Sequence, residues 1–265
     1  MATPQYNNFK ELPKALTFDV FGTTVTSTLI QKAATKLCSS KPVSLPPSTA
    51  ERASSLKDDD WARFAQEWRN GYMRFTTIFV PGETGWMDID THHHQSLIEL
   101  LKAWRLDGLY SDAEIKELSL IWHFLDPWSD SSSGLHKLGT KCLTSSLSNG
   151  NQSLLKDLDE HGNLGFQRLQ SSADFKVYKP HPQVYLGAVK AMGLEPGEVS
   201  MVAAHLADLK AARDCGLKTI YVERAGEEDW GVESEEYADS KTWVDMWVKV
   251  GENGFVEVAK RFGIE

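Results

Sequence analysis

The sequence contains only three cysteines among its 265 residues, Cys38, Cys142 and Cys215, and none of them belongs to a CxxC motif. Three cysteines cannot all pair, and their spacing matches neither a disulfide framework nor a zinc site. We therefore expect reduced thiols and a cytoplasmic protein.

Long apolar runs are also missing. No stretch approaches the roughly 18 apolar residues that a membrane-spanning helix needs. Residues 1–14 are polar, include Pro4 and Pro13, and lack the apolar segment of a secretory signal. These features predict a chain without a membrane partner.

Basic residues are fewer than acidic ones, with 28 Lys and Arg against 37 Asp and Glu and a formal net charge of −9. Nucleic-acid binding needs a surface that neutralises phosphates, so nucleic acid is not an expected partner. Apolar residues make up 41% of the chain and charged residues 25%, as in ordinary globular proteins. The length suits one large α/β domain, or a core that carries a smaller inserted domain.

Segments with strand and helix character alternate along much of the chain, which predicts a parallel sheet with crossover helices. The first strand-like segment is 15–20, in KALTFDVFGTT, and it runs into a tight loop at Gly22. The other strand-like segments are 141–148, 175–178, 199–204 and 217–222, and the helix-like ones between them are 152–161, 182–192 and 209–215.

The middle third of the chain has helical character instead. Aromatic residues between Trp61 and Phe79 follow the helical period after an acidic start at 58–60. Residues 92–104 and 112–124 are predicted as further helices, 41–48 as a loop and 129–134 as a turn. The predicted fold is therefore α/β, with a Rossmann-like, doubly wound parallel sheet core (residues 1–23 and 136–265) and an inserted helical cap (24–135).

Polar side chains follow the predicted strands at their carboxyl ends, where open parallel sheets bind their ligands. These side chains are Asp19, Ser148, Asn149, Lys179, His205 and Asp208. A carboxylate, a hydroxyl, an amide, a lysine and a second acid are thus expected to meet in one crevice.

Four segments occur in the order of the motifs of the haloacid dehalogenase superfamily, and they give this chain its resemblance to that family over nearly all of the predicted core. They are Asp19-Val20-Phe21-Gly22-Thr23, Ser148-Asn149-Gly150, Lys179-Pro180-His181-Pro182 and Asp208. The resemblance implies a Rossmann-like core with a mobile cap, in agreement with the pattern of elements.

Two departures indicate which branch of the superfamily the chain resembles. Its phosphatases usually carry a second Asp two residues after the nucleophile and adjacent acids in the last motif. Here Phe21 occupies the first of these positions, and Leu209 follows Asp208. The chain therefore resembles the (S)-2-haloacid dehalogenases, which implies a hydrolase that uses no metal and no cofactor and acts on a small halocarboxylate.

The resemblance also assigns roles in the core. Asp19 would displace the halide and form an ester, Lys179 would keep Asp19 ionised, and Asp208 would hold Lys179 and position water. The expected substrate contacts are Phe21, Thr23, Ser148 and Asn149, with backbone N–H groups gripping the substrate carboxylate. In this branch, (S)-2-haloacids become (R)-2-hydroxy acids.

The predicted cap carries a second clue. Trp68-Arg69-Asn70-Gly71-Tyr72 resembles the segment whose arginine receives the departing halide in that branch. Arg69 is therefore expected to stabilise the halide, and Asn70 and Tyr72 to contact the substrate. A solvated or salt-bridged Arg69 is the alternative, since it lies beside the apolar stripe.

The last motif departs from the branch. Residues 203–208 are Ala-Ala-His-Leu-Ala-Asp, where the dehalogenases resemble Ser-Ser-Asn-x-x-Asp. His205 in place of the amide predicts a pH-sensitive hydrolytic step, and packing is its alternative role. Two further functions stay open: an Mg²⁺-dependent phosphatase of the same superfamily, which Phe21 disfavours, and a diverged accessory protein of a biosynthetic pathway.

Two remaining features carry weaker signals. His92, His93 and His94 point to different sides of a helix, so no metal site is predicted there. The amphipathic segment 241–250 is expected to pack on the core, with an oligomer contact, such as a homodimer, as its alternative use.

Overall fold

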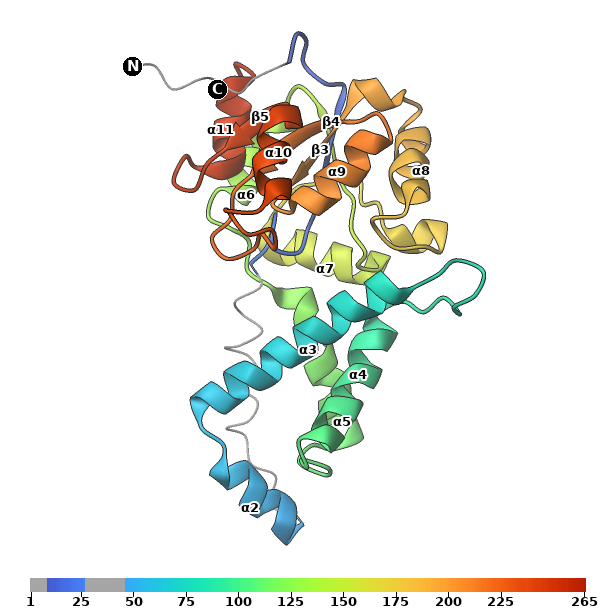
Figure 1. Cartoon of the computed structure of the whole chain (residues 1–265), viewed down its shortest axis with the longest axis vertical. Helices are drawn as coiled ribbons and strands as arrows, with labels where there is room; N and C mark the ends of the chain where they lie inside the picture. The colour runs from blue at the N-terminus through green and yellow to red at the C-terminus, as the bar shows by residue number, and fades with distance from the viewer. Residues whose placement is uncertain (1–8, 27–45) are drawn as a thin grey trace. The chain divides into compact units, whose positions relative to one another are not determined.

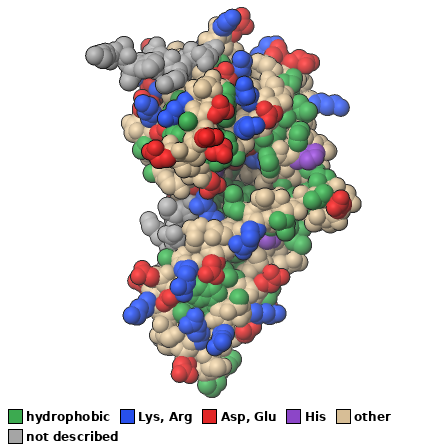
Figure 2. Space-filling view, in the orientation of Figure 1, with side chains coloured by type: hydrophobic (Ala, Val, Ile, Leu, Met, Phe, Trp, Pro, Cys, Tyr) green, Lys and Arg blue, Asp and Glu red, His purple; other side chains and the backbone are tan. Residues whose placement is uncertain are grey.

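The structure is a computed structural model that describes residues 9–26 and 46–265 (Figure 1). The chain divides into two compact units: a core unit of residues 1–27 and 126–265, and a helical unit of residues 28–125. Acidic and basic side chains are interspersed on the visible surface of each unit (Figure 2). Within the described residues, every helix is too short or too polar to cross a bilayer. Cys38 and part of the predicted loop 41–48 lie outside them.

The core unit is built on a five-stranded sheet in which every pair of neighbouring strands is parallel, in the order β2-β1-β3-β4-β5. The strands are β1 (Ala15–Phe18), β2 (Leu143–Ser146), β3 (Val199–Ala203), β4 (Lys218–Val222) and β5 (Met246–Val248). Phe18 at the end of β1 is in register with Ser146 of β2 and Val202 of β3. The chain therefore leaves these three strands at one edge of the sheet, and the predicted parallel α/β fold is confirmed.

Helices follow the strands of the core unit. They are α6 (Ser131–Leu138), α7 (Gln152–Gly162), α8 (Pro182–Met192), α9 (Leu206–Asp214), α10 (Glu235–Trp243) and α11 (Gly254–Arg261), with short 3₁₀ turns η2 (Ser172–Phe175) and η3 (Pro196–Glu198). Helix α8 has the predicted bounds. Pro182 lies in its first turn, and Gly193 ends it with a φ of +69°. Proline suits the first helical turn and glycine the left-handed end, so the sequence marks both ends clearly.

The helical unit comprises α2 (Pro47–Ser55), α3 (Asp58–Ile78), α4 (Ile89–Ala103), α5 (Asp112–Ser119) and the 3₁₀ turn η1 (Leu120–Phe124). Aromatic side chains join α3, α4 and η1. His93 is fully buried and stacks on Trp122 with ring centroids 4.2 Å apart. Neither ring nitrogen of His93 has a hydrogen-bond partner among the described residues, and burial holds its pKa well below the ordinary value. A neutral His93 thus serves as a packing residue of this unit.

Two segments of the core unit differ from the predicted elements. Residues 175–178, predicted as a strand, contain the end of η2 and Lys176 in the left-handed region (φ +58°), a conformation that no strand adopts. The polar residues Arg168 and Ser171 instead form isolated bridges with Ser145 and Ser148. Only the tertiary structure selects this pairing, because 168–171 has no apolar strand pattern.

The C-terminal part also contains elements that the sequence pattern did not reveal. Residues 241–250 pack on the core as expected, but they include the end of α10 and the edge strand β5. Helix α6 lies where a turn was predicted at 129–134, and α11 lies near the end of the chain, where no element was predicted. The two helices pack against each other. Each of these elements is eight residues or shorter, so its periodicity is too brief to detect.

The boundary between the units falls after Leu125, earlier than the predicted boundary at 135. Asp130 gives the physical reason. Its carboxylate accepts hydrogen bonds from Nη1 and Nη2 of Arg224 at 2.5 and 2.9 Å and from the backbone N–H of Phe255 at 2.7 Å. Arg224 Nε in turn donates to the carbonyl of Thr23 at 3.0 Å. Residues 126–135 are therefore tied to the core unit and to the loop after β1.

We expect Asp130→Ala to lower the free energy of unfolding of the core unit by about 3–5 kcal/mol, because it leaves the guanidinium of Arg224 buried without its charge partner. Urea denaturation measures this loss. The control is Asp214→Ala, which removes an exposed ion pair with Lys210 and costs at most about 1 kcal/mol. Similar losses in the two variants would contradict the assignment.

Candidate active site

Asp19 directly follows β1, and its carboxylate is fixed from three directions. Oδ1 accepts a hydrogen bond from Nζ of Lys179 at 2.7 Å, and Oδ2 accepts one from the hydroxyl of Thr23 at 2.6 Å. Nδ1 of His205 lies 3.1 Å from Oδ2. The residue is only 7% exposed, so these partners replace most of its hydration. The structure thus brings Asp19, Lys179 and His205, three of the residues that were expected to meet, together with Thr23.

The charges around Asp19 determine its ionisation. Burial by itself would raise the pKa of Asp19, but the positive charge of Lys179 and the hydrogen bond with His205 outweigh burial and hold the pKa well below its ordinary value. Burial likewise disfavours the charged form of Lys179, and the charges of Asp19 and Asp208 more than compensate, so its pKa is raised. At neutral pH Asp19 is therefore a carboxylate and Lys179 an ammonium.

Asp208, in the first turn of α9, binds the other side of Lys179. Its Oδ2 accepts from Nζ of Lys179 at 2.7 Å, and its Oδ1 accepts from the hydroxyl of Tyr185 at 2.5 Å. Burial and the nearby charge of Asp19 raise the pKa of Asp208, although Lys179 and Tyr185 act in the opposite direction. One buried ammonium thus joins two buried acids, with the side chain of Lys179 only 9% exposed.

Ser148 and Asn149 lie at the end of β2, where their oxygens are used within the protein. Asn149 Oδ1 accepts from the backbone N–H of Lys179 at 2.7 Å and from the hydroxyl of Ser172 at 2.9 Å. Ser148 Oγ accepts from the backbone N–H of Gly150 at 3.1 Å. Asn149 therefore anchors the main chain of Lys179, and the predicted substrate contacts of Ser148 and Asn149 stay predictions.

Thr23 and His205 connect the loop after β1 to the end of β3. The hydroxyl of Thr23 accepts from the backbone N–H of Ala204 at 2.9 Å while it donates to Asp19. His205 precedes α9, and its pKa is raised: burial opposes the charge, but the hydrogen bond and the charge of Asp19 favour it. Phe21 is half-buried beside this site, in the same loop. The imidazole whose titration was predicted to make hydrolysis pH-sensitive therefore interacts directly with Asp19.

Three predicted site residues lie on α3 of the helical unit. Arg69 is half-buried, and Asn70 is exposed and accepts a hydrogen bond from Nε2 of Gln66 at 2.9 Å. Tyr72 is 9% exposed and packs against His93 and Trp122 within the unit. Their expected contacts with halide and substrate stay predictions, and for Tyr72 the ring contacts show a packing role as well.

Sequence reasoning missed Tyr185 and Glu227. Tyr185 is fully buried on α8, within an apolar stripe where an aromatic residue ordinarily indicates packing, and only its hydrogen bond to Asp208 reveals a second use. Glu227 is only 3% exposed, although it opens the acidic stretch 227–239, whose composition is typical of a surface loop. Neither residue belongs to a motif, so no local signal marks it.

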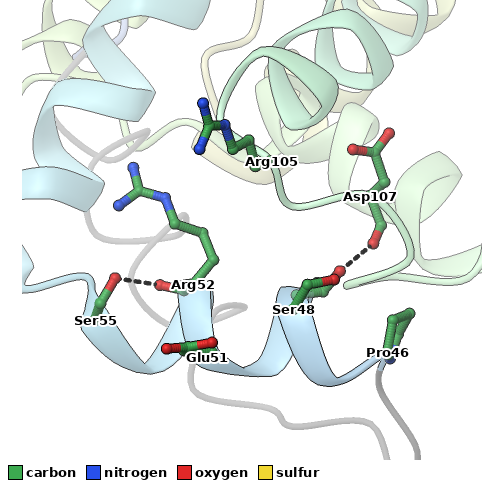
Figure 3. A pocket seen from close by; sticks show the side chains of 8 residues that line it. Pro46, Ser48, Glu51, Arg52, Ser55, Arg105 and Asp107 are labelled. Carbon is green, nitrogen blue, oxygen red and sulfur yellow. Dashed lines mark hydrogen bonds between the residues drawn. The ribbon is translucent and has the colours of Figure 1, made fainter.

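A separate cavity of about 660 Å³ lies within the helical unit, between α2 and the loop at residues 105–107 (Figure 3). Arg52 and Arg105 both line it. The hydroxyl of Thr49 donates to the carbonyl of Asp107 at 2.8 Å, and Nε of Arg52 donates to the carbonyl of Trp104 at 3.2 Å. These polar groups hold α2 to the loop, and the lining includes none of the residues around Asp19.

The fold and this site define a class of α/β hydrolases with an aspartate at the end of the first strand. The family model of the haloacid dehalogenase-like hydrolases matches residues 13–216, and the chain belongs to this family. The solved structure of a defluorinating L-2-haloacid dehalogenase is similar, with a TM-score of 0.78 and 30% identity over 95% of each chain.

Curated relatives match shorter stretches. An (S)-2-haloacid dehalogenase of Burkholderia cepacia is 31% identical over 105 residues, which are 38% of this chain and 46% of the relative. A glyceraldehyde 3-phosphate phosphatase of Pyrococcus furiosus is 36% identical over 69 residues, which are 25% of this chain and 29% of the relative. The matched region thus spans about half, or less, of these relatives.

Lys179→Met should lower the free energy of unfolding by about 3–5 kcal/mol at pH 8, because it leaves Asp19 and Asp208 buried without their shared cation. The carboxyl pKa values then rise above the ordinary value of about 3.9, so the folded state binds more protons than the unfolded state. Stability is consequently lost as pH rises through the folded pKa values. Urea unfolding at pH 5 should therefore show a smaller deficit than at pH 8.

The control for this variant is Lys190→Met, at an exposed position of α8. Its effect on stability should be small and independent of pH between 5 and 8. A Lys179→Met deficit that is equal at both pH values would show that lost packing, and not the unpaired acids, causes it.

Proposed function

We propose that this protein is a metal-independent hydrolytic dehalogenase that converts a small 2-haloalkanoic acid into a 2-hydroxy acid. The observation that carries the proposal is the ionised, buried Asp19 paired with Lys179, with Phe21 where a phosphatase of the superfamily usually has its second acid. The similarity to 2-haloacid dehalogenases supports the same substrate class.

In the first step a carboxylate oxygen of Asp19 attacks the substrate carbon and the carbon–halogen bond breaks, so that the halide leaves with the bonding electrons. The product is an ester of Asp19. Inversion at this carbon would convert an (S)-2-haloacid into an (R)-2-hydroxy acid. Lys179 and Thr23 keep the carboxylate oriented during the attack. The substrate carboxylate would be bound by backbone N–H groups near Thr23, Ser148 and Asn149, and by the Ser148 hydroxyl.

In the second step water attacks the carbonyl carbon of the Asp19 ester and gives one proton to a base. The bond between this carbon and the ester oxygen then breaks, and that oxygen takes the remaining proton of the added water, so the 2-hydroxy acid leaves and Asp19 is again a carboxylate. His205 is suited to take the proton of this water. The ester carries no charge, so the part of the pKa increase of His205 that comes from the charge of Asp19 is lost when the ester forms. The imidazole then releases its proton to solvent, and as a neutral base it accepts one from water. Regenerated Asp19 again faces a protonated His205, so the proton balance of the cycle closes. Asp208 holds Lys179 throughout.

The second candidate function is an Mg²⁺-dependent phosphatase, which the similarity to the Pyrococcus furiosus enzyme supports. A screen for halide release separates the two candidates. Fluoroacetate, chloroacetate and both enantiomers of 2-chloropropionate are incubated with the protein in the presence of chelator, and a generic phosphate ester is incubated with and without Mg²⁺. Halide release in chelator supports the dehalogenase. Phosphate release only with Mg²⁺, without halide release, would replace it by the phosphatase, and activity in neither assay would favour an accessory protein.

Single turnover in H₂¹⁸O should place the label in the carboxylate of Asp19, because water attacks the carbon of the ester and one of its oxygens stays with Asp19. Mass spectrometry of the peptide that contains Asp19 measures it. Asp19→Asn should abolish halide release and leave the circular dichroism spectrum unchanged. Label found in the hydroxy acid alone would indicate direct attack of water on the substrate.

Arg69→Lys should lower kcat by about tenfold or more if Arg69 stabilises the halide, since the change keeps the charge but loses the planar set of donors. The effect should differ between chloro and bromo substrates, because their leaving groups differ in size and charge density. Arg63→Lys, an exposed arginine on the same helix that pairs with Asp60, is the matched control. An unchanged kcat for both halides would remove Arg69 from the reaction.

A further inference from the structure

Glu227 is a buried acid near the site, and neither step of the proposed reaction assigns it a role. It follows β4 and is 3% exposed. Its carboxylate and the ring of His205 converge on Gly22: a Cβ on this glycine would lie 2.5 Å from Oε2 of Glu227 and 3.0 Å from Cε1 of His205. Gly22 also has a φ of +79°, so a glycine is required here both for space and for backbone conformation. Any side chain at this position would displace one of the two groups.

The segment that carries Glu227 is fixed to the loop that follows Asp19. The backbone N–H of Glu227 donates to the carbonyl of Arg224 at 3.3 Å, and Arg224 is clamped by Asp130 and by the carbonyl of Thr23. The indole N–H of Trp128 donates to the carbonyl of Gly22 at 3.0 Å. The backbone at Glu227 is therefore held by the same contacts that hold the loop after Asp19.

Three acids, Asp19, Asp208 and Glu227, act on the imidazole of His205, and Lys179 lies between the first two. Asp19 faces Nδ1, Asp208 lies one turn along α9, and Glu227 lies near the Cε1 edge of the ring. All three favour the charged imidazole against the effect of burial. Lys179 is bound to Asp19 and Asp208, at 2.7 Å from each.

Ester formation changes this balance. Asp19 loses its charge, and the ammonium of Lys179 is then paired with the carboxylate of Asp208 alone. We propose that Glu227 is a positioning residue for His205, whose carboxylate stabilises the imidazolium that forms when His205 takes a proton from the water attacking the Asp19 ester. The water oxygen bonds to the carbonyl carbon, and its proton goes to His205. This inference rests on the proposed dehalogenase reaction.

The first test measures the pKa of His205 by NMR and needs no substrate. We expect a lower pKa in Glu227→Gln than in the parent, because the variant keeps the shape of the side chain and removes its charge. The same comparison in an Asp19→Asn background imitates the uncharged ester, and there Glu227→Gln should again lower the pKa. Asp229→Asn, which removes an exposed acid two residues along the same loop, is the control and should leave the pKa unchanged.

The second test follows turnover of whichever 2-haloacid the parent hydrolyses. Glu227→Gln should lower kcat about tenfold, equivalent to about 1.4 kcal/mol of lost stabilisation. The first-turnover halide burst should remain, and the Asp19 ester should accumulate and be detectable by mass spectrometry. The acidic limb of the kcat profile should move to lower pH, since His205 stays neutral to lower pH without Glu227. Asp229→Asn should retain the parent profile.

The outcomes separate the two hypotheses. A parent that releases no halide from any 2-haloacid overturns the proposed function, and the NMR titration still decides whether Glu227 acts on His205. An unchanged His205 pKa in Glu227→Gln, or a turnover profile equal to that of the parent, overturns the role of Glu227. If Glu227→Gln does not fold, Glu227→Asp keeps the charge but withdraws it by one methylene, and a smaller fall of the His205 pKa in the same direction is then required.

Discussion

The ammonium of Lys179 lies 2.7 Å from the carboxylates of both Asp19 and Asp208, and much of the core unit is arranged around this buried contact. Two acids so close together could not both stay ionised without a cation between them. The protein therefore has to bring Lys179 to the ends of β1 and β3 with little freedom. Asn149 does this through the main chain, by accepting the backbone N–H of Lys179 at 2.7 Å.

The parallel sheet provides the frame for this contact. Because β1 lies between β2 and β3 in register, Asp19, Ser148 and His205 emerge at the same edge although they are far apart in the sequence. A second buried pair, between Asp130 and Arg224, ties the start of α6 and the loop after β4 to the carbonyl of Thr23. The loop after the nucleophile is thus fixed by an ion pair that itself takes no part in the proposed chemistry.

The imidazole of His205 changes the electrostatics of the last motif. An amide at this position would not titrate, whereas an imidazole responds to the charge of Asp19, which the proposed reaction removes and restores in each cycle. The nucleophile and the proposed base are therefore coupled through one hydrogen-bond contact. The proposed reaction leaves the charge of Glu227, near the Cε1 edge of the imidazole, unchanged.

The sequence by itself determined the parallel α/β fold, the helical character of residues 61–124 and the group of Asp19, Lys179 and Asp208. The fold and the helices follow from apolar strands and helical periods, and Asp19 directly follows a strand. Lys179 and Asp208 were placed by the order of the family motifs, since the strand predicted before Lys179 is not formed. It did not determine β5, α6 or α11, whose periodic stretches are too short to detect. Nor did it reveal Tyr185 or Glu227, since a tyrosine in an apolar stripe and a glutamate in an acidic loop have ordinary local explanations. Only the tertiary structure places the hydroxyl of Tyr185 against Asp208 and the carboxylate of Glu227 near His205, because both contacts join segments that are brought together by the sheet.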